Sequence, residues 1–289
     1  MKTPGEDDMR ISGFLFGAAI AFSAGVVSAS AADLPARMST IAPIVAPVAA
    51  HNWTGCYIGG NAGGGTSHSN FTTLVTAGPP GFNHLGPESR DSVNAAAPGP
   101  ADDAGFIGGG QVGCNWQTGS IVFGLEGDFD YFGTNPSLTR NGVVSDNVIP
   151  STITNSVKTS WLATVRPRVG LAFDRSLLYL TGGLAITNLR YTQSFEDLLA
   201  SHGIGGSSAS KTQLGWTVGG GWEYALTNSW SVKGEYLYAQ FSSVGAVGSI
   251  ATVNIAPFSN GLQGTADLKT HIVRVGANYH FNNPVVARY

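Results

Sequence analysis

Histidine and cysteine are the residue types in this sequence that could ligate a metal or take part in catalysis. No two histidines are four residues apart, and no cysteine–histidine spacing suggests a zinc site. His68 and His84 share the polar segment 66–103, where a metal or a haem edge could bind, although polar surface is the simpler interpretation. The sequence therefore predicts no resident cofactor. The histidines are His51, His68, His84, His202, His271 and His280.

Two glycine runs and the hydroxyl residues are the other candidates for chemistry. The runs at 59–65 and 108–110 resemble phosphate-binding loops only superficially, because no helix and no lysine follows them. A hydrolase would need a clustered Ser–His or Asp–His set, and the spacing along the sequence brings none together. We therefore expect no enzyme activity. The formal net charge of −3 also gives no attraction for a polyanion, so nucleic acid is not an expected partner.

The composition indicates which elements must carry these residues. Only 11% of the residues are charged, against about 25% in soluble domains. After the N-terminal segment no apolar run reaches about 18 residues, which excludes a bundle of transmembrane helices. A charge-poor chain with 40 glycines and no long apolar run is typical of strands that present one face to lipid.

Alternation of apolar and polar residues with a period of two begins at Trp53. In Ser120–Tyr131, apolar side chains such as Phe123 lie on one face and acidic ones such as Glu126 on the other, which no helix produces. Pro167 inside a strand counts against this scheme, because proline donates no ladder hydrogen bond, and a bulge there would accommodate it. The predicted strands are Trp53–Gly65, Ala104–Trp116, Ser120–Tyr131, Val157–Phe173, Ser176–Tyr191, Lys211–Leu226, Trp230–Phe241 and Lys269–Phe281.

The connections between these strands alternate strictly between short and long. Short turns are predicted at 117–119, 174–175 and 227–229, and long loops at 66–103, 132–156, 192–210 and 242–268. An even strand number with all long loops at one end is the pattern of outer-membrane barrels. We therefore predict an all-β fold, an eight-stranded antiparallel up-and-down transmembrane β-barrel. Both termini are then periplasmic, in the outer membrane of a Gram-negative bacterium.

Opposite charges recur on the strand faces that the barrel turns inward. Counting from the short turns places Glu126 level with Arg168 and Asp128 level with Arg166. The alternative is solvated charge on the outside of a soluble sandwich. We predict an ion-pair network in the lumen, which a narrow barrel buries. Its members are Glu126, Asp128, Arg166, Arg168, Glu223, Lys233, Glu235 and Arg274.

The tryptophans and cysteines complete the set of candidate residues. All six tryptophans fall in predicted strands and are expected to form two aromatic belts at the membrane interfaces. The strand register places Cys56 opposite Cys114, so either a cross-strand disulfide or two free lipid-facing thiols is possible. The belt residues are Trp53, Trp116, Trp161, Trp216, Trp222 and Trp230.

Four segments of the chain are expected. Residues 1–31 have the apolar core and the small-residue cleavage pattern of a signal peptide, and an uncleaved anchor is the alternative. Three acidic residues precede that core, so Met9 is a second candidate start. Residues 32–52 are predicted to form a periplasmic lead-in, 53–281 the barrel and 282–289 a C-terminal extension.

Five segments resemble one known family. They are WTGCYIGGNAGGG (53–65), GFIGGGQVGCNWQTGSIVFGLEGDFDYF (105–132), WLATVRPRVGLAFDRSLLYLTGGLA (161–185), LGWTVGGGWEYALTNSWSVKGEYLY (214–238) and VRVGANYHF (273–281). Together they resemble the small outer-membrane immunogenic, porin-like proteins of alphaproteobacteria. The resemblance implies an OmpA/OmpX-like eight-stranded barrel that is abundant, surface-exposed and antigenic.

Two features depart from that family. Members of the family usually have an aromatic residue at the positions of Cys56 and Cys114. The presence of cysteine at both positions favours a paired replacement. Members also tend to end on an aromatic residue that the barrel-assembly machinery reads. Here Tyr279 and Phe281 form that pattern, but 282–289 follows it, so either Phe281 or Tyr289 would serve as the signal.

These observations predict a structural, surface-exposed protein that stabilises the envelope and presents antigenic loops. The alternatives are a small porin and a soluble lipocalin-like barrel. Physical reasoning favours the first, because side chains fill the interior of an eight-stranded barrel. The expected partners are outer-membrane lipid and lipopolysaccharide, the barrel-assembly machinery, and a host or environmental ligand at the loops.

Overall fold

Six of the described strands, with 20–23 residues each, are far longer than a membrane requires. The computed structural model describes residues 51–144, 148–254 and 258–281. β8, β9 and β10 have 23 residues each, about 75 Å of extended chain, whereas a transmembrane strand needs about 9–11 residues. The elements are β1 Gly55–Thr76, α1 Pro87–Ala96, β2 Gly99–Thr118, β3 Ile121–Phe132, β4 Ser137–Val144, β5 Ile149–Lys158, β6 Trp161–Phe173, β7 Ser176–Asp197, β8 Gly203–Ala225, β9 Trp230–Thr252 and β10 Ser259–Phe281.

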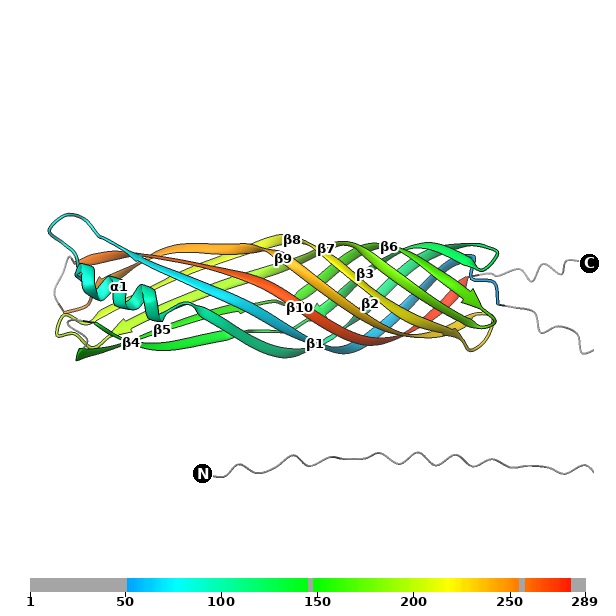
Figure 1. Cartoon of the computed structure of the whole chain (residues 1–289), viewed down its shortest axis with the longest axis horizontal. Coiled ribbons are helices and arrows are strands. Elements are labelled where there is room, and N and C mark those ends of the chain that lie inside the picture. The colour runs from blue at the N-terminus through cyan, green and yellow to red at the C-terminus, as the bar shows by residue number, and fades with distance from the viewer. Residues whose placement is uncertain (1–50, 145–147, 255–257, 282–289) are drawn as a thin grey trace, which may run out of the picture. The chain divides into compact units, whose positions relative to one another are not determined.

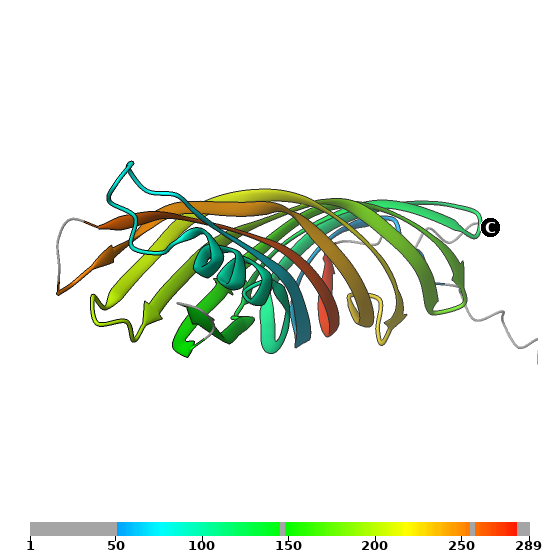
Figure 2. The same cartoon turned by 60° about the vertical axis from the view of Figure 1, so that its left-hand side comes forward.

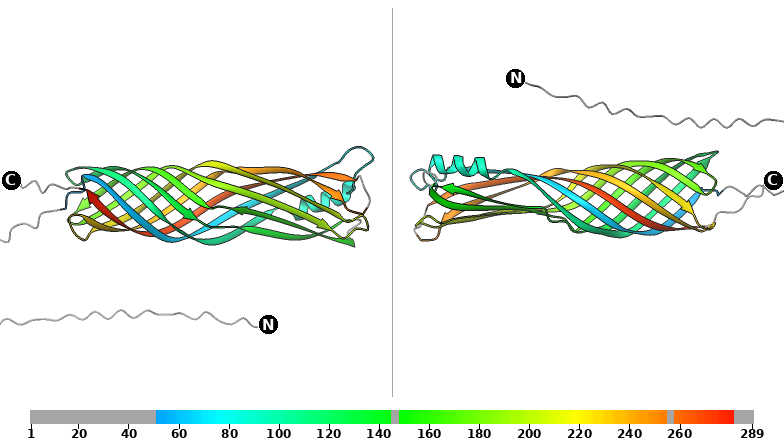
Figure 3. Two further views of the ribbon diagram at one scale, coloured as in Figure 1. Left: turned by 180° about the vertical axis from the view of Figure 1, so that it is seen from behind. Right: turned by 60° about the horizontal axis from the view of Figure 1, so that its bottom comes forward.

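Eight of the described strands close into a ring in which every neighbouring pair is antiparallel. The order around the ring is β1, β2, β3, β6, β7, β8, β9 and β10, and β10 pairs with β1 from Phe281 opposite Cys56 upward. Figures 1 and 3 show the strands crossing the barrel wall obliquely on all sides. The predicted eight-stranded all-β barrel is therefore confirmed.

The remaining two strands and the helix belong to one end of the barrel. β4 and β5 form a hairpin that continues β3 and β6, and β5 pairs with the far half of β7. The helix α1 contacts β4 and β1 at this end (Figure 2). The strand ring is therefore extended here by a hairpin and a helix.

The other end holds the three short turns. They follow β2, β6 and β8 and lie at the end away from α1 (Figure 1). Gly119 adopts a φ of +63° in the first of them, a left-handed conformation that favours glycine. The short turns predicted near 117–119, 174–175 and 227–229 are therefore present. We call the half of the barrel beside them the lower half and the half beside α1 the upper half.

Three of the four long segments predicted as loops are mostly strand, and the fourth, 66–103, is strand at both ends with α1 between them, so that prediction is wrong. β1 runs to Thr76 instead of ending at Gly65, and β10 begins at Ser259 instead of Lys269. These extensions are rich in Ser, Thr, Asn and Gly, because their outer face is polar. Such residues are typical of loops, which hid the strands.

Four layers of side chains fill the barrel from the short turns to the helix. A small apolar layer around Trp53 comes first, followed by a charged layer. A large apolar layer and a second one under α1 fill the upper half. The large apolar layer includes Phe71, Ile107, Phe132, Leu162, Leu189, Leu237, Phe241, Leu268 and Ile272.

Parts of the predicted domain organisation lie outside the described residues. These parts are the signal peptide 1–31, the lead-in up to residue 50 and the extension 282–289. Among the residues that the structure does describe, no helix combines the length and the hydropathy needed to cross a membrane.

Candidate functional site

Nine charged side chains point into the lower half of the barrel and contact one another there. We call this set, five carboxylates and four cations, the lumen cluster. None of the nine side chains is more than 2% exposed, so the lumen is filled at this level. Its members are Glu126, Asp128 and Asp130 on β3, Arg166 and Arg168 on β6, Glu223 on β8, Lys233 and Glu235 on β9, and Arg274 on β10.

Two arginines hold the centre of the lumen cluster. Arg166 lies 2.7 Å from Glu126, 2.8 Å from Asp128 and 3.2 Å from Glu235. Arg274 lies 2.9 Å from Asp128, 2.6 Å from Asp130 and 2.7 Å from Glu235. Each guanidinium therefore contacts three carboxylates on two strands that are not its own. These contacts join opposite walls of the barrel.

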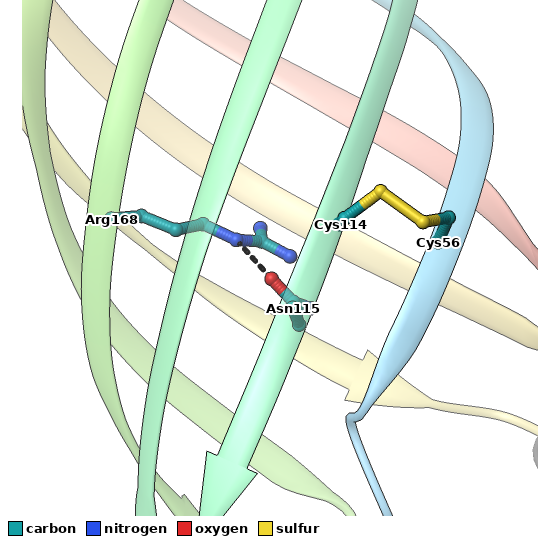
Figure 4. Close-up of a disulfide and its surroundings, with 4 residues drawn as sticks. All are labelled: Cys56, Cys114, Asn115 and Arg168. Atoms are coloured by element: carbon teal, nitrogen blue, oxygen red, sulfur yellow. Dashed lines mark hydrogen bonds between the residues drawn. A yellow bond between two sulfur atoms is a disulfide. The ribbon is translucent and has the colours of Figure 1, made fainter.

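Lys233 and Arg168 extend the lumen cluster toward the short turns. The Lys233 ammonium donates to both carboxylate oxygens of Glu126 at 2.8 Å. Arg168 lies 3.2 Å from Glu223 and donates to Asn115 Oδ1 at 2.9 Å (Figure 4). Every cation of the cluster therefore has at least one buried carboxylate partner.

Two tyrosines complete the polar layer, and neither was among the predicted residues. Tyr57 donates to Glu126 at 2.5 Å and Tyr179 donates to Glu235 at 3.0 Å. The Arg168 guanidinium lies 4.9 Å and 5.2 Å from the centres of these two rings. A Cβ at Gly113 would collide with the Tyr57 ring, so glycine is required where this ring crosses β2. The alternation of apolar and polar residues in the sequence could have placed both tyrosine side chains on the inward face of the barrel.

The predicted levels of the charges in the lumen need correction. Glu126 lies opposite Arg166, and Arg168 lies opposite Gly124, a shift of two residues from the expected register. Neighbouring strands of a tilted barrel are staggered, so equal counts from the turns do not give equal heights. Arg274 lies opposite Glu235. Lys233 lies opposite Glu223 but extends to Glu126, and Asp130 belongs to the cluster although the expected set lacked it.

Five of the six tryptophans are at least partly exposed on the outer wall. Trp116, Trp222 and Trp230 lie near the short turns, and Trp216 and Trp161 lie higher, with Trp161 stacked on Phe129.

Trp53 is fully buried in the barrel mouth, where its ring centre is 4.6 Å from that of His51. Its assignment to a belt is wrong. It shares the inward parity of Tyr57, and it packs with the small apolar layer, which closes the lower mouth beneath the lumen cluster.

The remaining predicted residues lie on the lipid-facing side of the lower half. Cys56 and Cys114 face each other across β1 and β2 and are joined by a disulfide (Figure 4). Tyr279 and Phe281 point outward at the end of β10, and they are 39% and 50% exposed. The Tyr279 ring packs edge-to-face on the rings of Phe281 and Trp230, with ring centres 5.4 Å and 5.3 Å apart.

The two histidines that were considered for a joint metal or haem site have different partners. His68 contacts Asp102 on the outer wall, whereas the buried His84 contacts Asp197 at the upper end. Ser201 also contacts His84, at 3.2 Å. The expectation that no Ser–His or Asp–His set would cluster is therefore wrong. These residues lie in segments predicted as separate loops, and only tertiary structure brings them together.

The chain is similar in sequence to outer-membrane proteins of other bacteria. A 31 kDa outer-membrane immunogenic protein of Brucella melitensis is 34% identical over 260 residues, which are 88% of this chain and 94% of the relative. A 22 kDa outer membrane protein of Rhizobium leguminosarum is 36% identical over 137 residues, 47% of this chain and 53% of the relative. The solved structure of OprG from Pseudomonas aeruginosa aligns with a TM-score of 0.37 and 12% identity, covering 80% of this chain and 99% of OprG.

The match to a family model is the more extensive finding. The model described as the outer membrane protein beta-barrel domain matches residues 18–281, which include every described strand. The chain therefore belongs to the outer membrane protein beta-barrel domain family.

Proposed function

We propose that this protein is a structural outer-membrane barrel that stabilises the envelope and presents its upper half as an antigenic surface. The observation that supports this role is the filled lumen. The lumen cluster lies between apolar layers above and below it. An eight-stranded barrel has an interior that side chains just fill. This role requires no catalysis by the barrel itself.

A small porin is the alternative that conductance can test. The folded protein is incorporated into planar bilayers, and its single-channel conductance is measured beside that of a porin as a positive control. We expect no steady conductance above the bare bilayer, because charged side chains occupy the lumen without a water-filled path. Steady openings of nanosiemens size would contradict the structural role and support the porin.

We further propose that the short turns and both termini of the chain face the periplasm. The support is the asymmetry of the barrel, since polar-faced strand extensions all lie at the α1 end, and outer-membrane barrels keep short turns periplasmic. Protease added to intact cells should cleave the β1–α1 connection at 77–86. The turn at 226–229 should be cleaved only after the outer membrane is permeabilised. The reverse result would overturn this orientation.

The proposed partners follow from the outer surface. Outer-membrane lipid and lipopolysaccharide contact the apolar band, the barrel-assembly machinery reads Tyr279 and Phe281, and a host or environmental ligand meets the upper loops. Replacing Phe281 by Ser should reduce the heat-modifiable folded fraction in the outer membrane. The same change at Phe173, which is similarly exposed beside a short turn, is the control. Equal loss in both variants would exclude a specific sorting signal.

We also propose that the Cys56–Cys114 disulfide forms in the periplasm, which is oxidising. Alkylation of the unfolded protein without reductant, followed by mass spectrometry, should then modify neither cysteine. Alkylation after reduction should modify both. Modification without reductant would show free thiols instead.

A further inference from the structure

Three side chains at the upper end of the barrel form a continuous hydrogen-bonded chain. They come from three separate segments: His84 from the β1–α1 connection, Asp197 from the end of β7, and Ser201 from the β7–β8 connection. His84 Nε2 lies 2.7 Å from Asp197 Oδ2, and Ser201 Oγ lies 3.2 Å from His84 Nδ1. The side chains of His84 and Asp197 are 1% and 0% exposed. The order of the groups is hydroxyl, imidazole, carboxylate.

The carboxylate of this chain is held in one position. Asp197 Oδ1 accepts hydrogen bonds from the backbone N–H groups of Leu199 at 3.0 Å and Gly203 at 3.1 Å. Burial raises the pKa of Asp197, but hydrogen bonds from His84 and from these two N–H groups lower it by more, so that it lies below its ordinary value. The group is therefore an anion at neutral pH.

The fixed anion determines which nitrogen of His84 carries a proton. Asp197 accepts a hydrogen bond, so the neutral imidazole places its N–H on Nε2 and leaves the Nδ1 lone pair free. That lone pair faces the Ser201 hydroxyl, which donates to it. In serine proteases the two nitrogens have exchanged positions, but the roles are the same: the base contacts the nucleophile and the carboxylate orients the base.

An open cavity lies directly beside the hydroxyl and the imidazole. Its volume is about 490 Å³, and Ser201, His84 and Leu199 line it together with Gly86, Pro87 and Glu88. The last two residues are the first turn of α1, a helix of ten residues whose N-terminus carries partial positive charge. Glu88 also brings a carboxylate to this part of the lining. The lining is mainly polar, with Leu199 and Pro87 as its apolar contacts.

We propose that this cavity is an ester-hydrolase site, with Ser201 as nucleophile, His84 as general base and Asp197 as the residue that positions His84. The substrate class is an ester of a small acyl group with a polar alcohol, which fits the size and polarity of the lining. This activity is independent of the structural role of the barrel, since the lumen contributes nothing to it.

The reaction runs in two balanced steps. Ser201 Oγ attacks the ester carbonyl and transfers its proton to His84 Nδ1. The bond to the alcohol oxygen then breaks, and the alcohol leaves with that proton, which gives an acyl-serine. Water, deprotonated by His84, attacks the acyl-serine and releases the acid and the free hydroxyl of Ser201. The net reaction consumes one ester and one water and yields one acid and one alcohol.

The direct test is covalent labelling of the folded, full-length protein with a fluorophosphonate, which reacts with activated serines. The expected result is one label, located on Ser201 by peptide mass spectrometry, and its absence in Ser201→Ala. Ser210→Ala is the matched control, because Ser210 is exposed on the outer wall of β8 and bonds to Asn188. This control should label like the natural protein. Hydrolysis of p-nitrophenyl acetate should follow the same pattern.

Two further variants separate catalysis from a purely structural contact between loops. Asp197→Asn keeps the shape of the side chain but can donate to Nε2, which removes the free lone pair from Nδ1. The maximal labelling rate should fall by several orders of magnitude at unchanged probe affinity. In Gly203→Ala all three groups remain, but the added Cβ would collide with His84 Nε2, so labelling should also be lost.

Heat-modifiability on unheated gels confirms that each variant still forms the barrel. The proposal is overturned if the folded natural protein takes up no label on Ser201 above Ser201→Ala. It is also overturned if Asp197→Asn labels at the natural rate. Either result would leave the three residues as a structural tie between the loops of the upper end. The proposed envelope role would stand in both cases, because conductance and orientation are measured independently.

Discussion

The lower and upper halves of the barrel use the same strands with opposite polarity. On β10, Val275 and Tyr279 point outward in the lower half while Arg274 points inward. Five to six residues earlier in the chain than Arg274 the pattern is reversed, because Lys269 lies outside and Leu268 is fully buried in the apolar layer. The backbone pairing with β1 and β9 continues through both halves. The pairing with β9 shifts register once, between Ala266 and Leu268.

This difference shows that the solvent outside the barrel decides what fills its inside. Where lipid surrounds the strands, the outer face must be apolar, and the polar residues of the alternation necessarily lie inside, where they must pair. Where water surrounds them, burial of apolar surface drives folding and the apolar residues lie inside. The lower half is therefore held together by ion pairs, and the upper half resembles the core of a soluble protein.

Removing one charge from the lumen cluster should have the largest effect. Arg274→Ala leaves Asp130 without its cation and removes one of the cations that contact Asp128 and Glu235, and uncompensated buried charge typically costs about 3–5 kcal/mol. The free energy of unfolding, measured by urea titration in lipid vesicles, should fall by that amount. Lys269→Ala, on the same strand but outside and next to Asp267, should change it by less than about 0.5 kcal/mol. Similar losses in both variants would contradict the comparison.

Placing a charge on the outer wall tests the same comparison from the opposite side. Val275→Lys puts an ammonium on the lipid-facing side of β10, where the cost near the bilayer midplane is about 2–4 kcal/mol. Gln263→Lys makes the same change on the exposed outer face in the upper half and should stay within about 0.5 kcal/mol. Unfolding titrations of the two variants give the difference. A large cost at Gln263 would mean that lipid also surrounds the upper half.

A double-mutant cycle measures the pairing itself. Arg166 and Asp128 lie 2.8 Å apart, and removing either leaves the other buried without this partner. The double variant Arg166→Ala/Asp128→Ala should be less destabilised than the sum of the single variants, by about 1–3 kcal/mol. In the upper half, Thr139 and Thr154, which are exposed and 3.0 Å apart, provide the control cycle, with a coupling below about 0.5 kcal/mol. Simple additivity at Arg166 and Asp128 would exclude pairing.

The lower half could be predicted from the sequence because lipid makes its alternation unambiguous. Phe123, Leu125 and Phe129 have no reason to be on one face except contact with lipid, so the opposite face, with Glu126, had to be the lumen. The register was less certain. The stagger of tilted strands shifted Arg166 and Arg168 by two residues relative to the counts from the turns.

The upper half could not be predicted in the same way. Its outward-facing residues are mostly Ser, Thr, Asn and Gly, and the inward-facing residues alternate with them. The composition of strand segments such as 66–76 therefore resembles that of loops. The contacts among His84, Asp197 and Ser201 were also beyond the sequence. They join residues more than 110 positions apart, whose meeting depends on the closure of the ring by β1 and β10. Neither local propensity nor spacing contains that information.

Acid should loosen the upper end while it leaves the strand pairing of the lower half intact. Since the pKa of Asp197 in the folded protein lies below its ordinary value, its ionised form stabilises the fold above about pH 4, and that contribution is lost as the pH falls through the folded pKa. Hydrogen exchange gives the readout, because the amides of Leu199 and Gly203 donate to this carboxylate. Their protection factors should fall below pH 4 in the natural protein and be low at every pH in Asp197→Ala. Protection that is equal at pH 3 and pH 7 would show that the anion contributes nothing to the order of this end.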